Sequence, residues 1–298
     1  MRRTPHWAAQ HLAAVRVVLV LTVVVGLLYP LAMTAFAQLP DFRHQAHGSL
    51  VTAQGRAVGS SLIGQNFTDA KGNPLIQYFQ PRPSAAGNGY DPTASGASNL
   101  GPESVVDQLP TAGQPNSGKP SLLTQVCARS LAVGQLEHVD GSRPYCTPDG
   151  VGAVLGVYRS GGLTGAVTRV VSLNQACPTK PFLTSYQGVA VQCAKPTEDY
   201  SAALTVPVRG NAPANPVVPP DAVTASASGL DPQIGPAYAR LQAARVANAR
   251  GMRVADVLKL VSQYTTGRAL GVLGEPGVNV LELNLALDRS HPYPAKEA

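Results

Sequence analysis

The stretch SASGLDPQIGPAYARLQAARVANARG, residues 226–251, decides the fold class of the C-terminal part of the chain. Asp231 offers a side-chain oxygen for an N-cap, and Pro232 follows where the first turn of a helix tolerates proline. Gly251 suits the residue that ends a helix in a left-handed conformation. The stretch therefore predicts a helix that begins at Asp231 or Pro232, after a flexible approach through Ser228 and Gly229, and ends by Gly251.

Three arginines recur every five residues along this helix: Arg240, Arg245 and Arg250. At ~100° per residue, each is rotated by roughly 140° from the one before. They cannot form a single basic face. Arg245 stands beside Val246 among small alanines, which leaves two alternatives open: a buried, hydrogen-bonded guanidinium or an exposed helix charge.

The neighbouring segments indicate a mixed fold. Residues 253–265 place Val254, Val257, Leu258, Val261 and Tyr264 on one apolar stripe, which predicts a second helix. In residues 278–288, leucine occupies every second position from 281 to 287, which predicts a half-buried strand. Residues 61–67 and 75–85 suggest short strands and turns. We therefore expect an α+β domain.

The N-terminal region predicts a membrane anchor. Residues Val17–Ala37 contain no charge and span roughly 30 Å as a helix at ~1.5 Å per residue, the thickness of a bilayer core. Arginines at positions 2, 3 and 16 precede the span, which predicts a cytoplasmic segment 1–15, a single anchor over 16–37 and the rest of the chain outside. The alternative is a signal peptide cleaved near Ala35–Gln38, where the small residues fit a cleavage site.

Cysteine usage agrees with export. Four cysteines, none in a CxxC pair, favour two disulfides in an exported chain, with three connectivities open: Cys127, Cys146, Cys177 and Cys193. A zinc site would require closer ligand spacing. Turn-rich borders at 108–120 and 209–221 bracket the cysteines. We therefore expect a cysteine-containing insert over 105–220 within an extracytoplasmic domain formed by 38–104 and 221–298.

Several classes of function are disfavoured. The formal charge is +6 and the pI about 9.3, but aromatic residues make up only 5% and no basic run exceeds two residues, so nucleic-acid binding is not indicated. Residues 113–120 resemble a P-loop, yet Pro120 replaces the serine or threonine that would hold magnesium. Residues 48–104 and 221–289 have the composition of an ordered domain. No histidine falls in either segment, which disfavours a serine hydrolase.

Residues 94–101, ASGASNLG, superficially resemble the signature loop of ABC-type ATPases. Ser95, Gly96 and Ser98 are weak candidates for a nucleotide-binding loop, because backbone and hydroxyl donors can hold a phosphate. The alternative is a tight turn, with Gly96 in an unusual conformation and Asn99 bonded to its own backbone.

Four strings together resemble the KdpC family, a component of the bacterial Kdp potassium-transporting ATPase: GSSLIGQNF (59–67), YFQPRPSAAGNGYDPTASGASNLGP (78–102), VTASASGLDPQIGPAYARLQAARVANARG (223–251) and LGEPGVNVLELNLALD (273–288). The resemblance implies a single-pass protein of the bacterial cell membrane, embedded in lipid. Its implied partners are a channel-like subunit that carries potassium and a P-type ATPase subunit that hydrolyses ATP. The phosphorylated DKTGT motif of such pumps is absent from this sequence. ATP and potassium are therefore expected at the level of the complex, and the chain is expected to have no catalytic site.

The resemblance also supplies candidates for subunit docking or structural roles: Phe79, Arg82, Pro83, Asn99, Asp231, Pro232 and Arg245. One idea within the family is a catalytic chaperone that raises the ATP affinity of the pump subunit. An exported domain lies away from ATP, so docking on the transport subunits, which stabilises them or shapes potassium entry, is our preferred expectation. The insert departs from the usual family pattern. An anchored extracytoplasmic binding or adhesion module that uses the insert as its contact surface is the alternative function.

Overall fold

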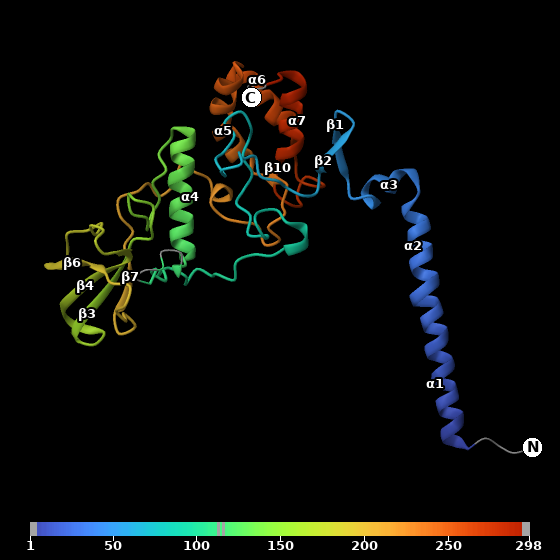
Figure 1. Cartoon of the computed structure of the whole chain (residues 1–298), viewed down its shortest axis with the longest axis horizontal. Helices are drawn as coiled ribbons and strands as arrows, with labels where there is room; N and C mark the ends of the chain where they lie inside the picture. Colours follow the sequence, from blue (N-terminus) through green and yellow to red (C-terminus); the bar gives the residue numbers. More distant parts are fainter. Residues whose placement is uncertain (1–4, 112–113, 115–116, 294–298) are drawn as a thin grey trace, which may run out of the picture. The chain divides into compact units, whose positions relative to one another are not determined.

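The computed structural model describes residues 5–111, 114 and 117–293, and the chain divides into two compact units, residues 1–62 and 63–298 (Figure 1). The first unit contains a long N-terminal helical stretch, and the second contains the cysteines and most of the family-like strings.

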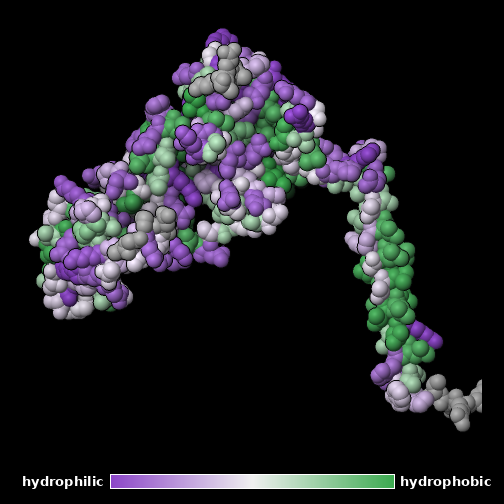
Figure 2. Space-filling model, in the orientation of Figure 1, coloured by the Kyte–Doolittle hydropathy of each residue, from purple (hydrophilic) through white to green (hydrophobic). Residues whose placement is uncertain are grey.

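The helical stretch of the first unit runs over His6–Ala37 and consists of α1 (His6–Val23), a π-helical turn η1 (Val24–Leu28) and α2 (Tyr29–Ala37). By length and composition it can cross a membrane, and apolar side chains cover most of its visible surface (Figure 2). The π turn ends at Leu28, two residues before Pro30. Proline has no amide hydrogen to donate to the preceding turn, so the helix widens there and continues.

The remainder of this unit consists of a short helix and a hairpin. Helix α3 (Pro40–Ala46) follows the apolar stretch, and strands β1 (Leu50–Ala53) and β2 (Arg56–Ser60) pair in antiparallel fashion. Gln54 and Gly55 connect the strands, both with positive φ, as a two-residue hairpin turn requires.

In the second unit, three helices and a small sheet enclose the largest hydrophobic core. The helices are α5 (Pro236–Arg250), α6 (Val254–Gln263) and α7 (Val280–Ser290). Strands β8 (Gln233–Ile234), β9 (Thr265–Thr266) and β10 (Gly277–Asn279) form an antiparallel sheet in the order β8-β10-β9. The predicted helix in residues 253–265 is confirmed as α6, which buries Val257 and Val261.

The predicted start of α5 is wrong by four to five residues. The helix begins at Pro236, after Gly235, and Gly251 ends it with a φ of +63° as expected. Proline at the first helical position is the right signal, but Pro236 provides it rather than Pro232. The amide of Gly235 donates to the carboxylate of Asp221 at 2.6 Å, while Asp231 is engaged elsewhere.

The predicted strand at 278–288 is also wrong, because all but the first two residues form α7. Its alternating leucines also fit a helix, which buries Val280, Leu283 and Leu287 on one side. The Asn279 side chain accepts from the amide of Glu282 at 3.1 Å and caps the helix. An asparagine followed three residues later by glutamate is a helix-start signal that outweighs the alternation.

A second sheet lies within the cysteine-containing segment. Its strands are β3 (Val154–Gly161), β4 (Thr164–Ala176), β5 (Ser185–Tyr186), β6 (Val189–Ala194) and β7 (Leu204–Pro207), in the order β5-β6-β4-β3-β7. All pairs are antiparallel except β4 with β6. One face packs Val154 and Val171 into a cluster, and the opposite face packs Leu155, Val157 and Val170 into another.

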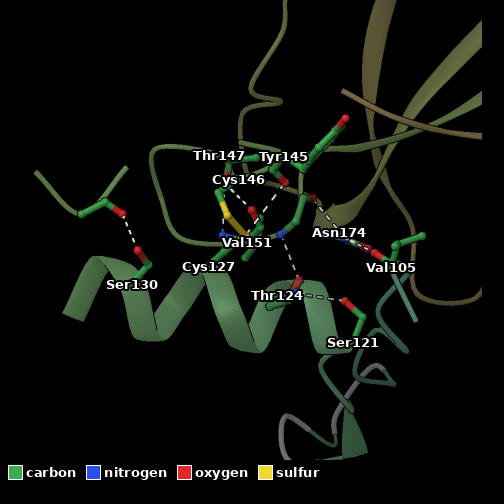
Figure 3. The surroundings of a disulfide bond; sticks show 12 residues. Val105, Ser121, Thr124, Cys127, Ser130, Tyr145, Cys146, Thr147, Val151 and Asn174 are labelled. Carbon is green, nitrogen blue, oxygen red and sulfur yellow. Dashed lines mark hydrogen bonds between the residues drawn. A yellow bond between two sulfur atoms is a disulfide. The ribbon is translucent and has the colours of Figure 1, made fainter. Parts of the chain in front are cut away.

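Helix α4 (Leu122–Glu137) connects this sheet to the main core. On one side, Thr124, Cys127 and Ser130 contact the loops that lead into the sheet (Figure 3). Thr124 accepts from the amide of Gly152 at 2.9 Å, and Cys127 forms a disulfide with Cys146. The opposite side packs Val126 and Val133 against the core of α5 to α7. One helix therefore serves both halves of the second unit.

Both predicted disulfides are present. Cys127 pairs with Cys146 and Cys177 with Cys193, so each bridge closes a short loop within the insert. The connectivity that the sequence left open is thus sequential. Cys177 directly follows β4 and Cys193 lies in β6, so the second bridge links β6 to the end of the strand with which it pairs.

Candidate subunit-docking region

Two side-chain amides bind the backbone of Phe79 and Gln80, which directly follow a turn at residues 75–78. The amide group of Gln242 on α5 accepts from the backbone of Gln80 at 2.7 Å and donates back to its carbonyl at 3.0 Å. Asn284 on α7 does the same for Phe79, at 2.9 and 3.0 Å. The two helices bind this backbone where a neighbouring strand would otherwise pair with it, and no strand forms in residues 75–85. The turn expected in the same residues does form, at 75–78. Phe79 is fully buried in the core between them.

Arg245 lies at the centre of this polar network and takes the buried alternative. Its guanidinium donates to the Glu137 carboxylate at 3.0 Å, to the carbonyls of Ile76 and Tyr78 at 2.5 and 3.0 Å, and to Gln242 at 2.9 Å. The side chains of Arg245 and Glu137 are 7% and 1% exposed. Removing either partner of such a buried ion pair strongly destabilises the fold, because the other charge is left buried without compensation.

Two opposing influences act on the pKa of the Glu137 carboxyl. Burial raises the pKa of the Glu137 carboxyl above its ordinary value, and the charge and hydrogen bond of Arg245 oppose that rise. One of its two oxygens, Oε2, has no hydrogen-bond partner within the described residues. Arg245 is therefore the main group that favours the ionised form of this carboxyl.

The rotation predicted for the three arginines of α5 is visible in their surroundings. Arg240 is exposed, whereas the side chain of Arg250 is fully buried and donates to Asp288 at 2.8 Å and to the carbonyl of Gln77 at 2.8 Å. Two of the three arginines thus fasten α5 to residues 76–78. They position backbone rather than present charge to a partner.

Arg82 and Asp231 join two of the family-like strings. The Arg82 guanidinium donates to the carbonyl of Thr224 at 3.2 and 3.3 Å and lies 3.4 Å from the Asp231 carboxylate. Asp231 also accepts from the Ser228 hydroxyl at 3.1 Å. The expectation that Asp231 caps a helix is therefore wrong, because its oxygens bind Arg82 and Ser228.

The other docking candidates occupy the same region. Pro83 lines a cavity of 530 Å³ beside α4, together with Arg82 and Tyr238. The carbonyl of Pro232 accepts from the amide of Val280 at the start of α7. Asn99 is exposed and makes no hydrogen bond within residues 5–111, 114 and 117–293. The structure therefore brings together all of these candidates except Asn99.

Ser95 and Gly96, two of the three candidates for a nucleotide-binding loop, bond to a carbonyl of the chain itself. A nucleotide role for Ser95, Gly96 and Ser98 stays a prediction. The amide of Gly96 donates to the Ser228 carbonyl at 2.9 Å, and the Ser95 hydroxyl donates to the same oxygen at 3.0 Å. Ser98 is exposed. The tight-turn alternative is wrong, because residues 95–101 form no turn, Gly96 has no positive φ, and Asn99 does not bond to the described backbone.

Gly64 permits the closest approach in this region. Its amide donates to the Leu230 carbonyl at 2.9 Å, and an added Cβ would lie 2.3 Å from the ring of Tyr90 and 2.8 Å from the carbonyl of Asp231. Tyr90 cannot withdraw easily, because its hydroxyl donates to the carbonyl of Arg82 at 2.6 Å. The close approach thus makes glycine necessary at position 64.

We therefore expect Gly64→Ala to lower the free energy of unfolding by about 1–3 kcal/mol, the usual cost of overpacking. Gly96→Ala is the matched control, since an added Cβ there meets no atom within 4 Å. Chemical denaturation of the full chain in detergent measures both. Equal stability of the two variants would contradict the packing described around Tyr90.

Sequence reasoning missed Glu137, Gln242 and Asn284. Glu137 lies in the expected insert, 108 residues from Arg245 along the chain, and nothing in its local sequence signals the contact. Gln242 and Asn284 are polar residues within the apolar faces of α5 and α7. A polar residue on a buried helix face is a signal for such a contact, because it must find a hydrogen-bond partner.

Comparison with known proteins identifies the chain. The family model described as "KdpC: K+-transporting ATPase, c chain" matches residues 11–109 and 191–289, which contain most of the network described above. The chain belongs to the KdpC family. The two matched stretches leave residues 110–190 between them, and this gap contains α4, with Glu137, and the hairpin of β3 and β4. The boundaries of the insert at 105 and 220 stay a prediction.

Curated relatives support the assignment. Proteins named "Potassium-transporting ATPase KdpC subunit" from Kineococcus radiotolerans, Myxococcus xanthus and Mycobacterium tuberculosis are 39%, 37% and 36% identical to this chain. The alignments cover 92%, 93% and 94% of this chain and 90%, 87% and 98% of those KdpC proteins, respectively. Since each alignment covers at least 92% of this chain, it extends across residues 110–190.

Proposed function

We propose that this chain is a non-catalytic accessory subunit of a potassium-transporting Kdp ATPase, anchored by its N-terminal helix and docked on the other subunits through its second unit. Membership of the KdpC family carries the accessory role, and the apolar helix His6–Ala37 supports the anchor. The partners of the proposal are the channel-like potassium subunit and the P-type ATPase subunit. Docking would stabilise them or shape potassium entry.

One structural observation favours docking over catalysis. The polar side chains of the family-like strings are bonded to the chain's own backbone, as Arg245, Gln242 and Arg82 illustrate. These side chains therefore hold the backbone in a fixed shape that another subunit can contact. A catalytic group would need to reach a substrate or reacting atom with an available donor, acceptor or nucleophile.

The proposal places residues 38–298 outside the cell. Two disulfides support this placement, because such bonds persist in oxidising compartments and are rare in the cytosol. Arginines before the apolar stretch favour the same orientation. An exported domain has no access to cytosolic ATP, and the Gly96 amide is already bonded to Ser228. Direct action on ATP affinity is therefore the less favoured mechanism.

Purification from native membranes tests the proposed function. A tagged full-length chain, extracted in mild detergent, is expected to recover the channel-like and ATPase subunits, identified by mass spectrometry, together with potassium-dependent ATPase activity. Recovery of the chain alone would contradict the proposal and favour an anchored binding or adhesion module. A chain with Arg240→Ala, a change on an exposed position of α5, serves as a positive control.

A further inference from the structure

An exposed apolar loop lies between β9 and β10. We call residues 269–274 the apolar finger. Leu270, Val272 and Leu273 are 90%, 73% and 58% exposed, and no charged residue lies within the finger. Single exposed apolar residues are ordinary on a protein surface. Three of them on one short loop form a local patch, which marks an interaction site when it is rimmed by polar groups.

The finger is held in a defined shape. Ala269 and Leu273 exchange two backbone hydrogen bonds, at 2.8 and 2.9 Å, and the amides of Gly271 and Val272 also donate within the loop. An ion pair between Arg268 and Glu275, at 2.7 Å, closes its base. The backbone polar groups are thus largely satisfied before any partner arrives, so little desolvation cost opposes burial of the tip.

Leu270 adds a conformational cost. Its φ is +53°, in the left-handed region that side chains other than glycine rarely adopt, while its side chain is almost wholly in solvent. Strained residues of this kind persist where the surroundings hold them and cluster at binding sites. The fold therefore presents Leu270 outward at the expense of both backbone strain and apolar exposure.

Two features favour a protein partner over a lipid surface. The base carries both signs of charge, since Arg268 is paired with a Glu275 side chain that is 79% exposed. A mixed rim is complementary to a polar protein rim, whereas an anionic headgroup layer would repel the glutamate. A bilayer is also fluid and requires no fixed loop shape, while a protein pocket rewards a loop that is already ordered.

We propose that the apolar finger docks into a complementary apolar pocket on another chain of the same ATPase, with Leu270 as the central contact. This inference rests on the proposed function, since it requires that the chain assemble with other Kdp subunits. Interfaces concentrate their binding energy in a few central side chains, and Leu270, Val272 and Leu273 have the exposure for that role.

Site-specific photocrosslinking tests the contact. The full chain carries p-benzoylphenylalanine in place of Leu270 and is illuminated in native membranes that contain the complete complex. We expect a crosslink to one other ATPase chain, identified by mass spectrometry. The matched control carries the same group in place of Leu163, which is 74% exposed at the tip of the β3–β4 hairpin, and is expected to give no such crosslink.

A charge substitution measures the energetic role. Leu270→Asp is expected to reduce recovery of the other subunits about tenfold or more without changing the thermal midpoint of the purified chain, because the side chain lies in solvent. Leu163→Asp is expected to leave recovery unchanged. A tenfold loss corresponds to about 1.4 kcal/mol of binding free energy.

The outcomes separate the two proposals. If the unmodified chain recovers the other subunits but Leu270 crosslinks only to lipid, to a second copy of this chain or to nothing, finger docking is overturned and the proposed function stands. Normal recovery with Leu270→Asp would also overturn it. If the unmodified chain recovers no other ATPase subunit, the proposed function fails and finger docking fails with it.

Discussion

Replacing Arg245 by alanine is expected to lower the free energy of unfolding by about 3–5 kcal/mol, the usual cost of breaking a buried ion pair. The substitution leaves the Glu137 carboxyl, 1% exposed in its side chain, without its donor. It also removes donors from the carbonyls of Ile76 and Tyr78. Chemical denaturation of the full chain in detergent measures the change.

The same substitution gives a defined pH dependence. Burial already raises the pKa of Glu137, and loss of Arg245 removes the main influence that lowers it. A carboxyl whose pKa is raised by folding destabilises the protein most at pH values above that raised pKa, because the unfolded chain ionises the group freely there. The unfolding free energy lost in Arg245→Ala is therefore expected to be largest at pH values above the raised pKa of Glu137. The loss should shrink as the pH falls through that pKa toward the ordinary pKa of a glutamate carboxyl.

Three variants control this prediction. Arg240→Ala lies on the exposed side of the same helix and is expected to change stability by no more than about 0.5 kcal/mol. Glu137→Gln is expected to cost less than Arg245→Ala, because a buried amide carries no charge. Replacing both residues by methionine is expected to recover part of the loss. If the double variant loses as much unfolding free energy as Arg245→Met and Glu137→Met lose in sum, that result would contradict the buried pair.

Removing the bridge between Cys127 and Cys146 is expected to destabilise the chain by about 3 kcal/mol, as loss of a disulfide that closes a loop of this length does. The bridge spans a sequence separation of 19 residues and holds α4 against the loop that precedes β3. The double change to serine, measured by thermal unfolding, tests this value. Mapping of unreduced peptides from native membranes should also show both bridges, and four free thiols there would contradict an exported insert.

The two disulfides are expected to differ in how strongly their removal affects the ion pair of Arg245 and Glu137. Helix α4 carries both Cys127 and Glu137, so loosening it should weaken the pair with Arg245 and make the two losses non-additive. The bridge of Cys177 and Cys193 links β6 to the end of its paired strand β4 in the second sheet, away from that pair. Its removal should be additive with Arg245→Ala. Additivity for both bridges would show that α4 keeps its position without Cys127.

Local signals in the sequence predicted several features correctly. The stripe of Val257 and Val261 identified α6, the even cysteine count indicated two disulfides, and the uncharged run before residue 38 indicated a helix long enough to span a membrane. These signals depend on residues close together along the chain, or on composition alone. Their physical origin is local periodicity and compartment chemistry.

The errors arose where distant residues decided the structure. Asp231 has the chemistry of a helix cap, but Arg82, 149 residues away, binds it. Phe79 and Gln80 were expected in a short strand, yet the side chains of Gln242 and Asn284 bind their backbone in place of a neighbouring strand. The α7 error differs, because a capping signal at Asn279 was present and the alternation of leucines was given more weight.

The most direct test of the account compares assembly with activity in the Arg245→Ala complex. Native membranes that carry this variant or Arg240→Ala are extracted in parallel, and subunit recovery, potassium-dependent ATPase activity and ATP affinity are measured. If the second unit serves docking, Arg245→Ala lowers recovery and activity in proportion, while ATP affinity of the remaining complex is unchanged. Intact assembly with a sharp fall in ATP affinity would contradict the account and favour direct action on the nucleotide.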